Sequence, residues 1–472
     1  MTKNEIAHKV LAPIERAGFK AYFVGGCVRD ELMGKEPHDY DICTDATPTE
    51  LHQIFSKFSN VSENSEPFGV TMPLIDGEEI EIATLRKDIT KGRHPKIEFT
   101  RSLEEDALRR DFTVNALYED QYGEVYDFVG GVDDCKRNLL RFVGDPAARL
   151  AEDPLRAFRF VRFLAKGFEP AYTVDEIAAL PKLDFSEVSK ERQLKELRQM
   201  LAGPYFMVYF DYFTAINVDE VIGLRAIFED MKTCKQSPKF HSEGDVYEHT
   251  KLVMKAMMGL LNEDLERERV FTENDRFILM LAAMLHDIGK APAGRKNGCK
   301  PGRDWPDVHD HDIVGAPIAR DFAHDLGLTN KEVNYVGELT RLHMRMHTLG
   351  QMTSDYKVLR ITSREEFPGL VMLAKADEMG CVKTVEDDWI GIHNTLQLPR
   401  VKHCIEMGAM PKQIITGNDL TCAGLVPGPY FKHRLETAHK YQIDKKETRK
   451  DVLLKVALGT TSPKVVLNGQ TV

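Results

Sequence analysis

Residues 21–42, AYFVGGCVRDELMGKEPHDYDI, constrain the fold of this chain more than any other stretch. The apolar run Tyr22–Val24 predicts a short buried strand, and a helix is expected over residues 27–33 after the glycine pair. Glycine allows the backbone to come close to an anion, and the first free N–H groups of a helix point at it. Gly26 is therefore expected to line a phosphate cradle, to which Arg29 adds a planar cation.

Two carboxylates, Asp39 and Asp41, end the same stretch. If residues 39–42 form a strand, both side chains point to one face, because side chains alternate with period two. Two adjacent carboxylates repel each other unless cations lie between them, and Mg²⁺ prefers carboxylate oxygens together with substrate phosphates. The stretch therefore predicts a metal-dependent phosphoryl or nucleotidyl transfer site.

Each part of this pattern also has an ordinary explanation. A glycine pair alone is usually a turn, and an Asp-x-Asp alone is usually an exposed edge. Their occurrence in this order, with an arginine between them, is much less expected by chance. Alternation in residues 79–84 places Glu79 and Glu81 on one face. We favour Glu81 as a third acidic group, and an exposed strand face is an equal alternative.

Composition limits the class of protein. The 472 residues are 42% hydrophobic and 29% charged, which is typical of globular proteins, and the length suggests about three domains. The N-terminus has no apolar signal core, and the longest apolar run, 277–285, is too short for a bilayer. Eight cysteines without a CxxC pair favour a cytoplasmic location. A net charge of −11 argues against a generally basic nucleic-acid coat, but leaves room for basic patches.

Local signals predict several further elements. They are an amphipathic helix over 2–18 with a kink at Pro13, a capping box at Thr47–Glu50, strands 70–74 and 79–85 around the turn Asp76–Gly77, and a helix over 191–201 ended by Gly203–Pro204. The polar, basic segment 87–96 is either an exposed hairpin or a segment that moves with substrate.

Two arginine-containing runs follow. In LEEDALRRDFTVNA, a helix would not give Arg109 and Arg110 the same exposure, so one is expected at a nucleotide phosphate and the other at local carboxylates.

In EDPLRAFRFVR, Asp153, Arg156, Arg159 and Arg162 recur at steps of three, which places them on one helix face. Apolar residues occupy the other side, so the charged face is directed at a ligand. An aspartate and an arginine held rigidly offer the acceptor and forked donor that a base edge requires. The helix is expected to start at about Asp153, because Pro154 is tolerated in a first turn.

The motifs GGxVRD, DxD, RRDFTxNA and EDxxRxxRxxR, in this order, resemble those of the class II tRNA nucleotidyltransferases, the CCA-adding enzymes. The resemblance covers about residues 20–165, and GRHPKIEF resembles the family's flexible loop. It implies an α+β chain: a polymerase-beta-like nucleotidyltransferase head, then an all-α neck and body. It also implies tRNA as partner, with CTP and ATP as substrates.

The resemblance implies roles for the charged residues at matching positions. Asp39 and Asp41 would hold two Mg²⁺ ions, with Glu81 as a possible third acid. The nucleotide-binding residues would be Gly26 and Arg29 at the triphosphate, Arg110 and Asp111 nearby, Asp153 and Arg156 at the Watson–Crick edge of CTP or ATP, and Arg159 and Arg162 in support.

A second constellation follows the order H…HD…H…H…D. Its members are His249, in a segment expected to precede a helix, then His286, Asp287, His311, His343 and Asp377. A single buried histidine is more often a core residue than a ligand, but this set suits Mn, Fe, Ni, Co or Zn. The HMRMH run lacks the glutamate of an HExxH protease site.

Residues 240–395 resemble the HD metal-dependent phosphohydrolase superfamily. The resemblance implies a site for a transition metal such as Ni²⁺, Mn²⁺ or Co²⁺, favouring two ions, and activity on 2′,3′-cyclic phosphates or phosphate monoesters. It selects His343 over His347 and His311 over His309. The tail carries nine Lys or Arg against four Asp or Glu over 432–464, which suits either RNA phosphate or a solvated helix.

The expected chain therefore has a head (1–140), a helical neck and body (141–235), an α-helical HD domain (236–395) and a helical tail (396–472). Its expected activity is template-independent addition of CCA to tRNA, with a second phosphohydrolase activity. The alternatives are a bacterial poly(A) polymerase, a partial CC- or A-adding enzyme, or mainly a phosphohydrolase with a tRNA-binding head. The sequence leaves the HD metal, the HD substrate and the oligomeric state open.

Overall fold

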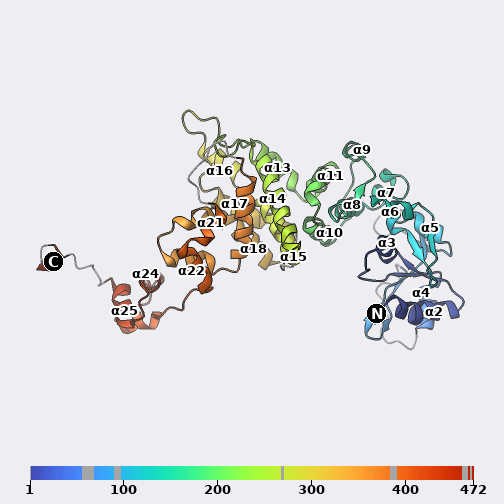
Figure 1. The fold of residues 1–472 in the computed structure, drawn as a ribbon, viewed down its shortest axis with the longest axis horizontal. Coiled ribbons are helices and arrows are strands. Elements are labelled where there is room, and N and C mark those ends of the chain that lie inside the picture. Colours follow the sequence, from blue (N-terminus) through green and yellow to red (C-terminus); the bar gives the residue numbers. More distant parts are fainter. Residues whose placement is uncertain are drawn as a thin grey trace. The chain divides into compact units, whose positions relative to one another are not determined.

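The computed structural model describes residues 2–55, 69–89, 97–266, 271–382, 391–459, 466–467 and 470–471 (Figure 1). The chain divides into two compact units. The first comprises Met1–Glu229 and Leu261–Met280, and the second comprises Asp230–Leu260 and Leu281–Val472. The finer division into head, neck and body, HD domain and tail stays a prediction.

The head contains a six-stranded sheet with the order β10-β9-β1-β2-β6-β3. Strand β1 lies inside it, antiparallel to both neighbours, and all four of its residues are buried, as the apolar run predicts. Strands β2 and β6 are parallel. The strands are β1 (Ala21–Val24), β2 (Ile42–Thr44), β3 (Val70–Thr71), β6 (Ile82–Thr84), β9 (Leu117–Glu119) and β10 (Val125–Asp127).

The Asp pair does not lie on a strand, so that expectation is wrong. Strand β2 begins at Ile42, and Asp39 and Asp41 belong to the segment that leads into it. The parallel pairing of Ile42 with Ile82 brings Asp41 beside Glu81, and the Ile42 N–H donates to the Glu81 carbonyl at 3.2 Å. The chain therefore enters both strands with an acidic residue at the same edge of the sheet.

The expected pair of long strands is divided into two shorter pairs. Strands β4 (Leu74–Ile75) and β5 (Glu78–Glu79) form a hairpin around Asp76–Gly77, where both residues have positive φ, as the turn between them requires. Strand β3 pairs with β6 instead. Glu79 consequently belongs to the hairpin and Glu81 to the approach to β6, which separates the two glutamates that alternation had placed together.

The remaining head elements follow local sequence signals. Helix α3 (Gly26–Leu32) matches the helix expected after the glycine pair, and α4 (Pro48–Ile54) has the predicted capping box. Strands β7 (Arg86–Asp88) and β8 (Ile97–Phe99) pair antiparallel, and residues 90–96 of the basic segment lie outside the described residues. After β8 the chain also forms α5 (Leu103–Leu108), η3 (Thr113–Asn115) and α6 (Gly131–Lys136), and β11 (Leu139–Leu140) follows α6.

The N-terminal helix is continuous but irregular. Helix α1 (Lys3–Ile6) passes through the π-helical segment η1 (Ala7–Leu11) into α2 (Ala12–Arg16). The Ala12 N–H donates to the Ala7 carbonyl directly before Pro13. The kink expected at Pro13 thus takes the form of a widened turn, since proline has no N–H to continue the regular ladder.

Helices α8 (Leu155–Ala165) and α10 (Lys190–Ala202) pack together after the head. Helix α7 (Pro146–Glu152) ends at Asp153, so α8 starts two residues later than expected. Helix α10 ends at Gly203, as predicted. The other elements here are β12 (Glu169–Pro170), α9 (Val174–Ala178), η4 (Phe206–Val208), α11 (Phe210–Ala215), α12 (Val218–Val221) and α13 (Leu224–Lys232).

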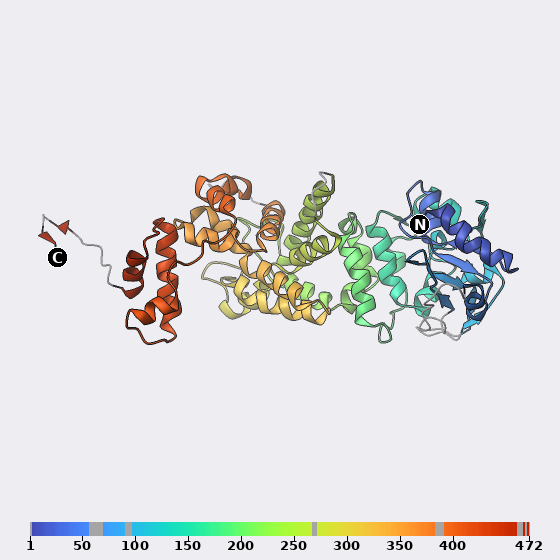
Figure 2. The same ribbon diagram turned by 90° about the horizontal axis from the view of Figure 1, so that it is seen from below.

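The second unit is almost entirely helical, and its helices α17 and α18 lie side by side (Figure 2). Helix α14 begins at Val246, so His249 lies within its first turn and does not precede the helix. Helices α14 (Val246–Glu266) and α15 (Glu273–Leu285) are divided between the two units. The later helices are α16 (Lys290–Asn297), α17 (His311–Asp325), α18 (Asn330–Thr348), η5 (Leu349–Gln351), α19 (Asp355–Thr362), α20 (Phe367–Gly380), α21 (Ile392–Gln397), α22 (Pro399–Met407), α23 (Gly417–Cys422), α24 (Tyr430–Asp444) and α25 (Lys450–Leu458).

Two further findings bear on the sequence analysis. All eight cysteines are free thiols. Among the described helices, none has both the length and the apolar character that crossing a bilayer requires.

Candidate functional site

A cavity of about 1190 Å³ in the first unit gathers nearly all the residues predicted for the head site. Eleven Lys or Arg and seven Asp or Glu line it, an excess of positive charge that suits a polyanion such as a triphosphate. Of the predicted residues, the lining includes Gly26, Arg29, Asp39, Asp41, Arg110, Asp111, Asp153, Arg156, Arg159 and Arg162. Glu81 is not among the lining residues.

The acidic edge of the cavity carries mutually repelling carboxylates. Desolvation raises the pKa of Asp41, Arg110 opposes this shift, and Asp39 adds to it. Desolvation also raises the pKa of Glu81, and the neighbouring Asp41 contributes to the shift. Neighbouring carboxylates repel each other and a divalent cation relieves this repulsion, so Asp39, Asp41 and Glu81 have the donor chemistry of a divalent-cation site.

The glycine pair also lines the cavity. Gly25 has a φ of +73°, which favours glycine, and its N–H donates to the Leu117 carbonyl at 3.0 Å. A side chain at Gly25 would also meet the guanidinium of Arg110. Arg29 is fixed by a hydrogen bond from its Nη1 to Asn115 Oδ1 at 2.6 Å, and its guanidinium lies over the Phe163 ring.

Asp106 organises the arginines that follow it. Its carboxylate is 1% exposed and accepts hydrogen bonds from Arg109, Arg110 and the Tyr118 hydroxyl at 2.6–3.1 Å. Both arginines are therefore held by this carboxylate, and both also line the cavity, so which of them meets a nucleotide phosphate stays a prediction. Helix α5 ends at Leu108, which frees Arg109 and Arg110 from the helical geometry that the sequence analysis assumed.

The buried Asp111 forms an ion pair with Arg159. Its Oδ2 lies 2.7 Å from Arg159 Nη2, and its Oδ1 accepts from the Phe112 N–H and from Asn115 Nδ2. Burial acts to raise the pKa of Asp111, but Arg159 and these hydrogen bonds outweigh it and lower the pKa. Asp111 thus reaches the cavity mainly through the arginine that it orients.

The charged face of α8 is held by protein contacts. Arg156 is 9% exposed and donates to the carbonyls of Arg149 and Arg109 at 2.8 Å, and to Glu152 at 3.0 Å. Asp153 accepts from the Leu155 N–H at 3.1 Å, and its other oxygen lies 3.4 Å from Arg192.

Arg162, one turn beyond Arg159 on the same helix, pairs with Glu196 of α10 at 2.9 Å. The side chains predicted to read a base are therefore in fixed orientations at the cavity.

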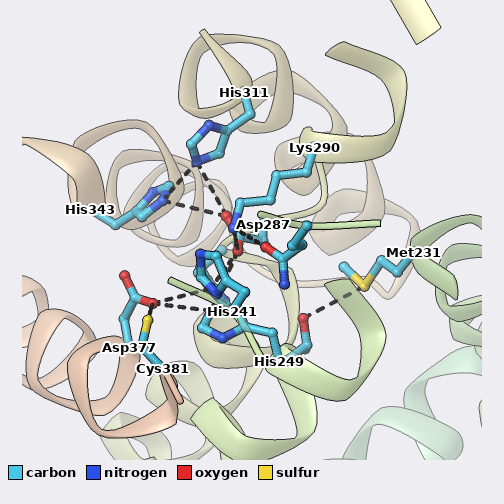
Figure 3. A network of polar contacts seen from close by, with 12 residues as sticks. Met231, His241, His249, Asp287, Lys290, His311, His343, Asp377 and Cys381 are labelled. Carbon is cyan, nitrogen blue, oxygen red and sulfur yellow. Dashed lines mark hydrogen bonds and ion pairs between the residues drawn. The ribbon is translucent and has the colours of Figure 1, made fainter. Parts of the chain in front are cut away.

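The second unit brings all six predicted HD residues together, and Figure 3 labels all of them except His286. The ligand atoms of His249, His286 and Asp287 lie within 4.8 Å of one another, and so do those of Asp287, His311 and His343. Asp377 joins the first group through its Oδ1, 3.1 Å from His249 Nε2. Asp287 is common to both triads, which is the arrangement that two bridged cations require.

Three of the imidazoles have the tautomer that suits a metal. His286, His311 and His343 each place Nδ1 at 2.7–3.0 Å from the carbonyl of the residue three positions earlier. A carbonyl only accepts, so Nδ1 carries the proton and Nε2 presents a lone pair. The Nε2 atoms of His311 and His343 lie 3.2 Å apart, and two such acceptors repel each other unless a cation lies between them. The residues therefore fit a metal centre.

Burial and charged neighbours shift the pKa values of two of these histidines in opposite directions. Burial lowers the pKa of His343 to about 3, so this imidazole is neutral at physiological pH, as a metal ligand must be. Burial also acts to lower the pKa of His249, but hydrogen bonds to Asp377 and Glu243 outweigh it and raise the pKa to about 9. A metal at His249 would therefore displace a proton.

Three charged or polar side chains at this site, His241, Glu243 and Lys290, were not predicted, and His347 had been set aside in favour of His343. Lys290 lies 2.6 Å from Asp287 and also donates to Gln236, His347 Nε2 lies 2.8 Å from Asp377 Oδ2, and Glu243 contacts both His241 and His249. Lys290 ends the HDIGK run, so its spacing from Asp287 was a usable signal. His309, which the resemblance set aside, is 80% exposed in its side chain.

Two segments match known domain families. Residues 21–141 match the poly A polymerase head domain, and residues 246–377 match the HD domain. Among solved structures, the CCA-adding enzyme of Bacillus stearothermophilus in complex with CTP aligns over 98% of both chains, with a TM-score of 0.64 and 20% identity. That of Thermotoga maritima in complex with tRNA covers 97% of this chain and 95% of its own, with a TM-score of 0.56 and 15% identity.

The chain has the fold of the CCA-adding enzymes. It carries a polymerase-type nucleotidyltransferase head, a helical body and an HD domain, as the sequence analysis expected. The CCA-adding enzyme of Bacillus pumilus is 42% identical over 200 residues, which are 42% of this chain and 49% of that enzyme. The enzyme of Lactobacillus helveticus is 35% identical over 245 residues, 49% of this chain and 59% of its own. These alignments thus span about half the length of the curated relatives.

Replacement of Asp106 by asparagine should destabilise the head. The change leaves two arginines without a buried counter-charge, which costs about 3–5 kcal/mol of unfolding free energy. Urea unfolding monitored by circular dichroism measures this loss, and Glu104→Gln, at an exposed position on the same helix, is the matched control. Equal stability of Asp106→Asn and the control would contradict the assignment.

The stability of the folded head at acidic pH should also depend on Asp106. Burial acts to raise the pKa of Asp106, but Arg110, Arg109 and Tyr118 hold it at about 2, below its usual value of 3.8. The carboxylate therefore stabilises the folded state above pH 3.8, and this contribution is lost as the pH falls toward 2. In Asp106→Asn that part of the pH dependence should be absent.

Proposed function

We propose that this chain adds C, C and A to the 3′ ends of tRNA from CTP and ATP, without a nucleic-acid template. The observation that carries the proposal is the pair of carboxylates Asp39 and Asp41 in the lining of a cavity rich in arginine, with Glu81 beside Asp41. Structures of the same fold in complex with CTP and with tRNA support it.

The head residues divide the chemistry among them. Asp39 and Asp41, with Glu81 beside Asp41, would hold Mg²⁺, which activates the attacking hydroxyl and neutralises charge on the leaving pyrophosphate when it is bound. The 3′ hydroxyl of the tRNA attacks the α-phosphate of the nucleotide. Arg29 and Arg110, both fixed by the contacts described above, are placed to bind the triphosphate oxygens.

We assign the selection of the nucleotide base to residues whose side chains are fixed by other protein groups. Arg156 is immobilised by three hydrogen bonds and Asp153 by the start of α8, so neither can follow a base of the wrong shape. We infer that these two side chains read the Watson–Crick edge of CTP or ATP, with Arg159 and Arg162 supporting the nucleotide. The tRNA itself would be recognised by shape and backbone, as is usual for RNA helices.

We propose that the HD site is a second, independent phosphohydrolase acting on 2′,3′-cyclic phosphates or phosphate monoesters. The convergence of four imidazole Nε2 atoms on two carboxylates supports it. Imidazole-rich sites favour transition metals such as Ni²⁺, Mn²⁺ or Co²⁺, which polarise a phosphate and generate a hydroxide nucleophile when bound. Lys290 would add a buried cation for the phosphate.

Asp41→Ala should abolish nucleotide addition. One carboxylate alone does not hold two cations against a triphosphate, so the rate should fall by at least about 100-fold, equivalent to several kcal/mol of metal catalysis. The assay uses tRNA lacking its CCA end with CTP alone, ATP alone and both.

Wild-type protein should add two C residues with CTP alone and CCA with both nucleotides. Long extension with ATP alone would indicate a poly(A) polymerase instead. Asp133→Ala, at a surface position that pairs only loosely with Lys136 at 3.8 Å, is the control. Retention of more than a few per cent of activity in Asp41→Ala would exclude the assigned metal site.

Asp153→Ala should loosen base discrimination. A good bidentate base contact is worth about 1–3 kcal/mol, so incorporation of UTP or GTP relative to CTP should rise by about 5- to 150-fold. Single-nucleotide addition with each of the four triphosphates measures the ratio, and Asp175→Ala on the exposed side of α9 is the control. An equal loss of rate for all four nucleotides would show a role in catalysis or folding.

Asp287→Ala should remove hydrolysis of a 2′,3′-cyclic nucleotide assayed with Ni²⁺, Co²⁺ or Mn²⁺, while CCA addition with Mg²⁺ survives. Asp287 is common to both metal triads, so its loss removes both. Asp325→Ala, 79% exposed on α17, is the control. Wild-type protein that hydrolyses nothing with these metals would mean that the HD set is structural, and loss of CCA addition in folded Asp287→Ala would mean that the two activities are coupled.

A further inference from the structure

Three of the four HD imidazoles are held by their own helices or the turn before them, and the fourth is held differently. His286, His311 and His343 donate Nδ1–H to a main-chain carbonyl. His249 instead has Nδ1 2.9 Å from a carboxylate oxygen, Glu243 Oε1. His249 lies in the first turn of α14, and Glu243 lies just before that helix begins.

Glu243 is itself rigidly placed. Its side chain is 4% exposed, and the same Oε1 that accepts from His249 accepts from His241 Nδ1 at 2.8 Å. Its Oε2 accepts from the Val382 N–H at 3.1 Å. Ser242 returns two hydrogen bonds to the Val382 carbonyl, from its N–H at 2.9 Å and its hydroxyl at 2.8 Å.

These contacts join two parts of the metal centre that are distant in sequence. Val382 follows α20, the helix that carries Asp377, and His249 Nε2 lies 3.1 Å from Asp377 Oδ1. Glu243 therefore fixes the segment that leads into His249 against the end of the helix that carries its neighbouring ligand. The rings of His241 and His249 also make a T-shaped contact, with 4.7 Å between their centroids (Figure 3).

We propose that Glu243 is a positioning residue of the HD metal centre. It holds His249 in the Nδ1–H tautomer with Nε2 turned to the metal, and its negative charge strengthens His249 as a donor. A carboxylate paired with a metal-bound histidine has this effect in general, and its loss typically costs about 10- to 100-fold in metal affinity. The inference rests on the HD metal site proposed above, but not on hydrolysis.

The test is Co²⁺ binding by the intact chain, with excess Mg²⁺ present to occupy the carboxylates of the head. Visible absorption of Co²⁺ reports imidazole ligands directly and needs no turnover. Glu243→Ala should weaken binding by about 10- to 100-fold. Glu243→Gln keeps an acceptor for His249 without the charge, so it should fall between Glu243→Ala and wild type.

Controls separate positioning from folding. Glu248 lies on α14, the helix that carries His249; it is 47% exposed and pairs with Lys251. The Glu248→Gln variant should therefore bind Co²⁺ as the wild type does. His249→Ala should lose the same part of the Co²⁺ spectrum as Glu243→Ala. Long-range ¹H–¹⁵N spectra of the Zn²⁺-bound protein, labelled at histidine, should show His249 with its proton on Nδ1 and a changed Nδ1 signal in Glu243→Gln.

The outcomes distinguish the proposals. Wild-type affinity in both Glu243 variants, or unchanged His249 signals, would overturn the positioning role. If Glu243→Ala fails to fold, Glu243→Gln and its spectrum decide. Wild-type protein that binds no Co²⁺ at imidazole would overturn this inference and the HD metal site together. Wild-type protein that binds Co²⁺ through Glu243-supported His249 but hydrolyses no phosphate ester would overturn only the proposed phosphohydrolase.

Discussion

A buried carboxylate between two arginines underlies the architecture of the head. Asp106 accepts from the Arg86 N–H and the side chain of Arg109 through Oδ1, and from Arg110 and Tyr118 through Oδ2. Arg109 in turn offers its carbonyl to Arg156. One ionised group thus ties strand β7, the cavity wall and helix α8 into a single electrostatic unit, and a neutral residue at this point would leave two partly buried arginines uncompensated.

The sequence predicted those parts of the head that depend on local geometry. The strand before the glycine pair and helix α3 follow from apolar patterning and from the positive φ of Gly25, which are properties of adjacent residues. The choice between Glu79 and Glu81 could not be made in that way. It depends on the parallel pairing of β2 with β6, two strands separated by about forty residues, and alternation within one strand carries no information on such pairing.

In the HD centre, too, some residues were predicted from the sequence and others became evident only from contacts between distant segments. The structure brings together the six residues that the resemblance to the HD superfamily selected, and their role as metal ligands stays a prediction. Glu243 escaped prediction, since a lone glutamate before a helix looks like a surface residue until the helices are assembled, and the choice of His343 over His347 set aside a histidine that lies beside Asp377. The helical geometry assumed for the two arginines after α5 was wrong, because the helix that would have separated them had already ended.

The ion pair of Lys290 with Asp287 sets the charge balance of the HD centre. Three buried carboxylates, Asp287, Asp377 and Glu243, and one ammonium leave a formal charge of −2 when the imidazoles are neutral. A single divalent ion would bring the centre to neutrality, and a second would turn it into a dication. Only the doubly loaded centre would therefore match the charge of a phosphate dianion, so metal stoichiometry itself would determine whether an anionic ligand is held or ignored.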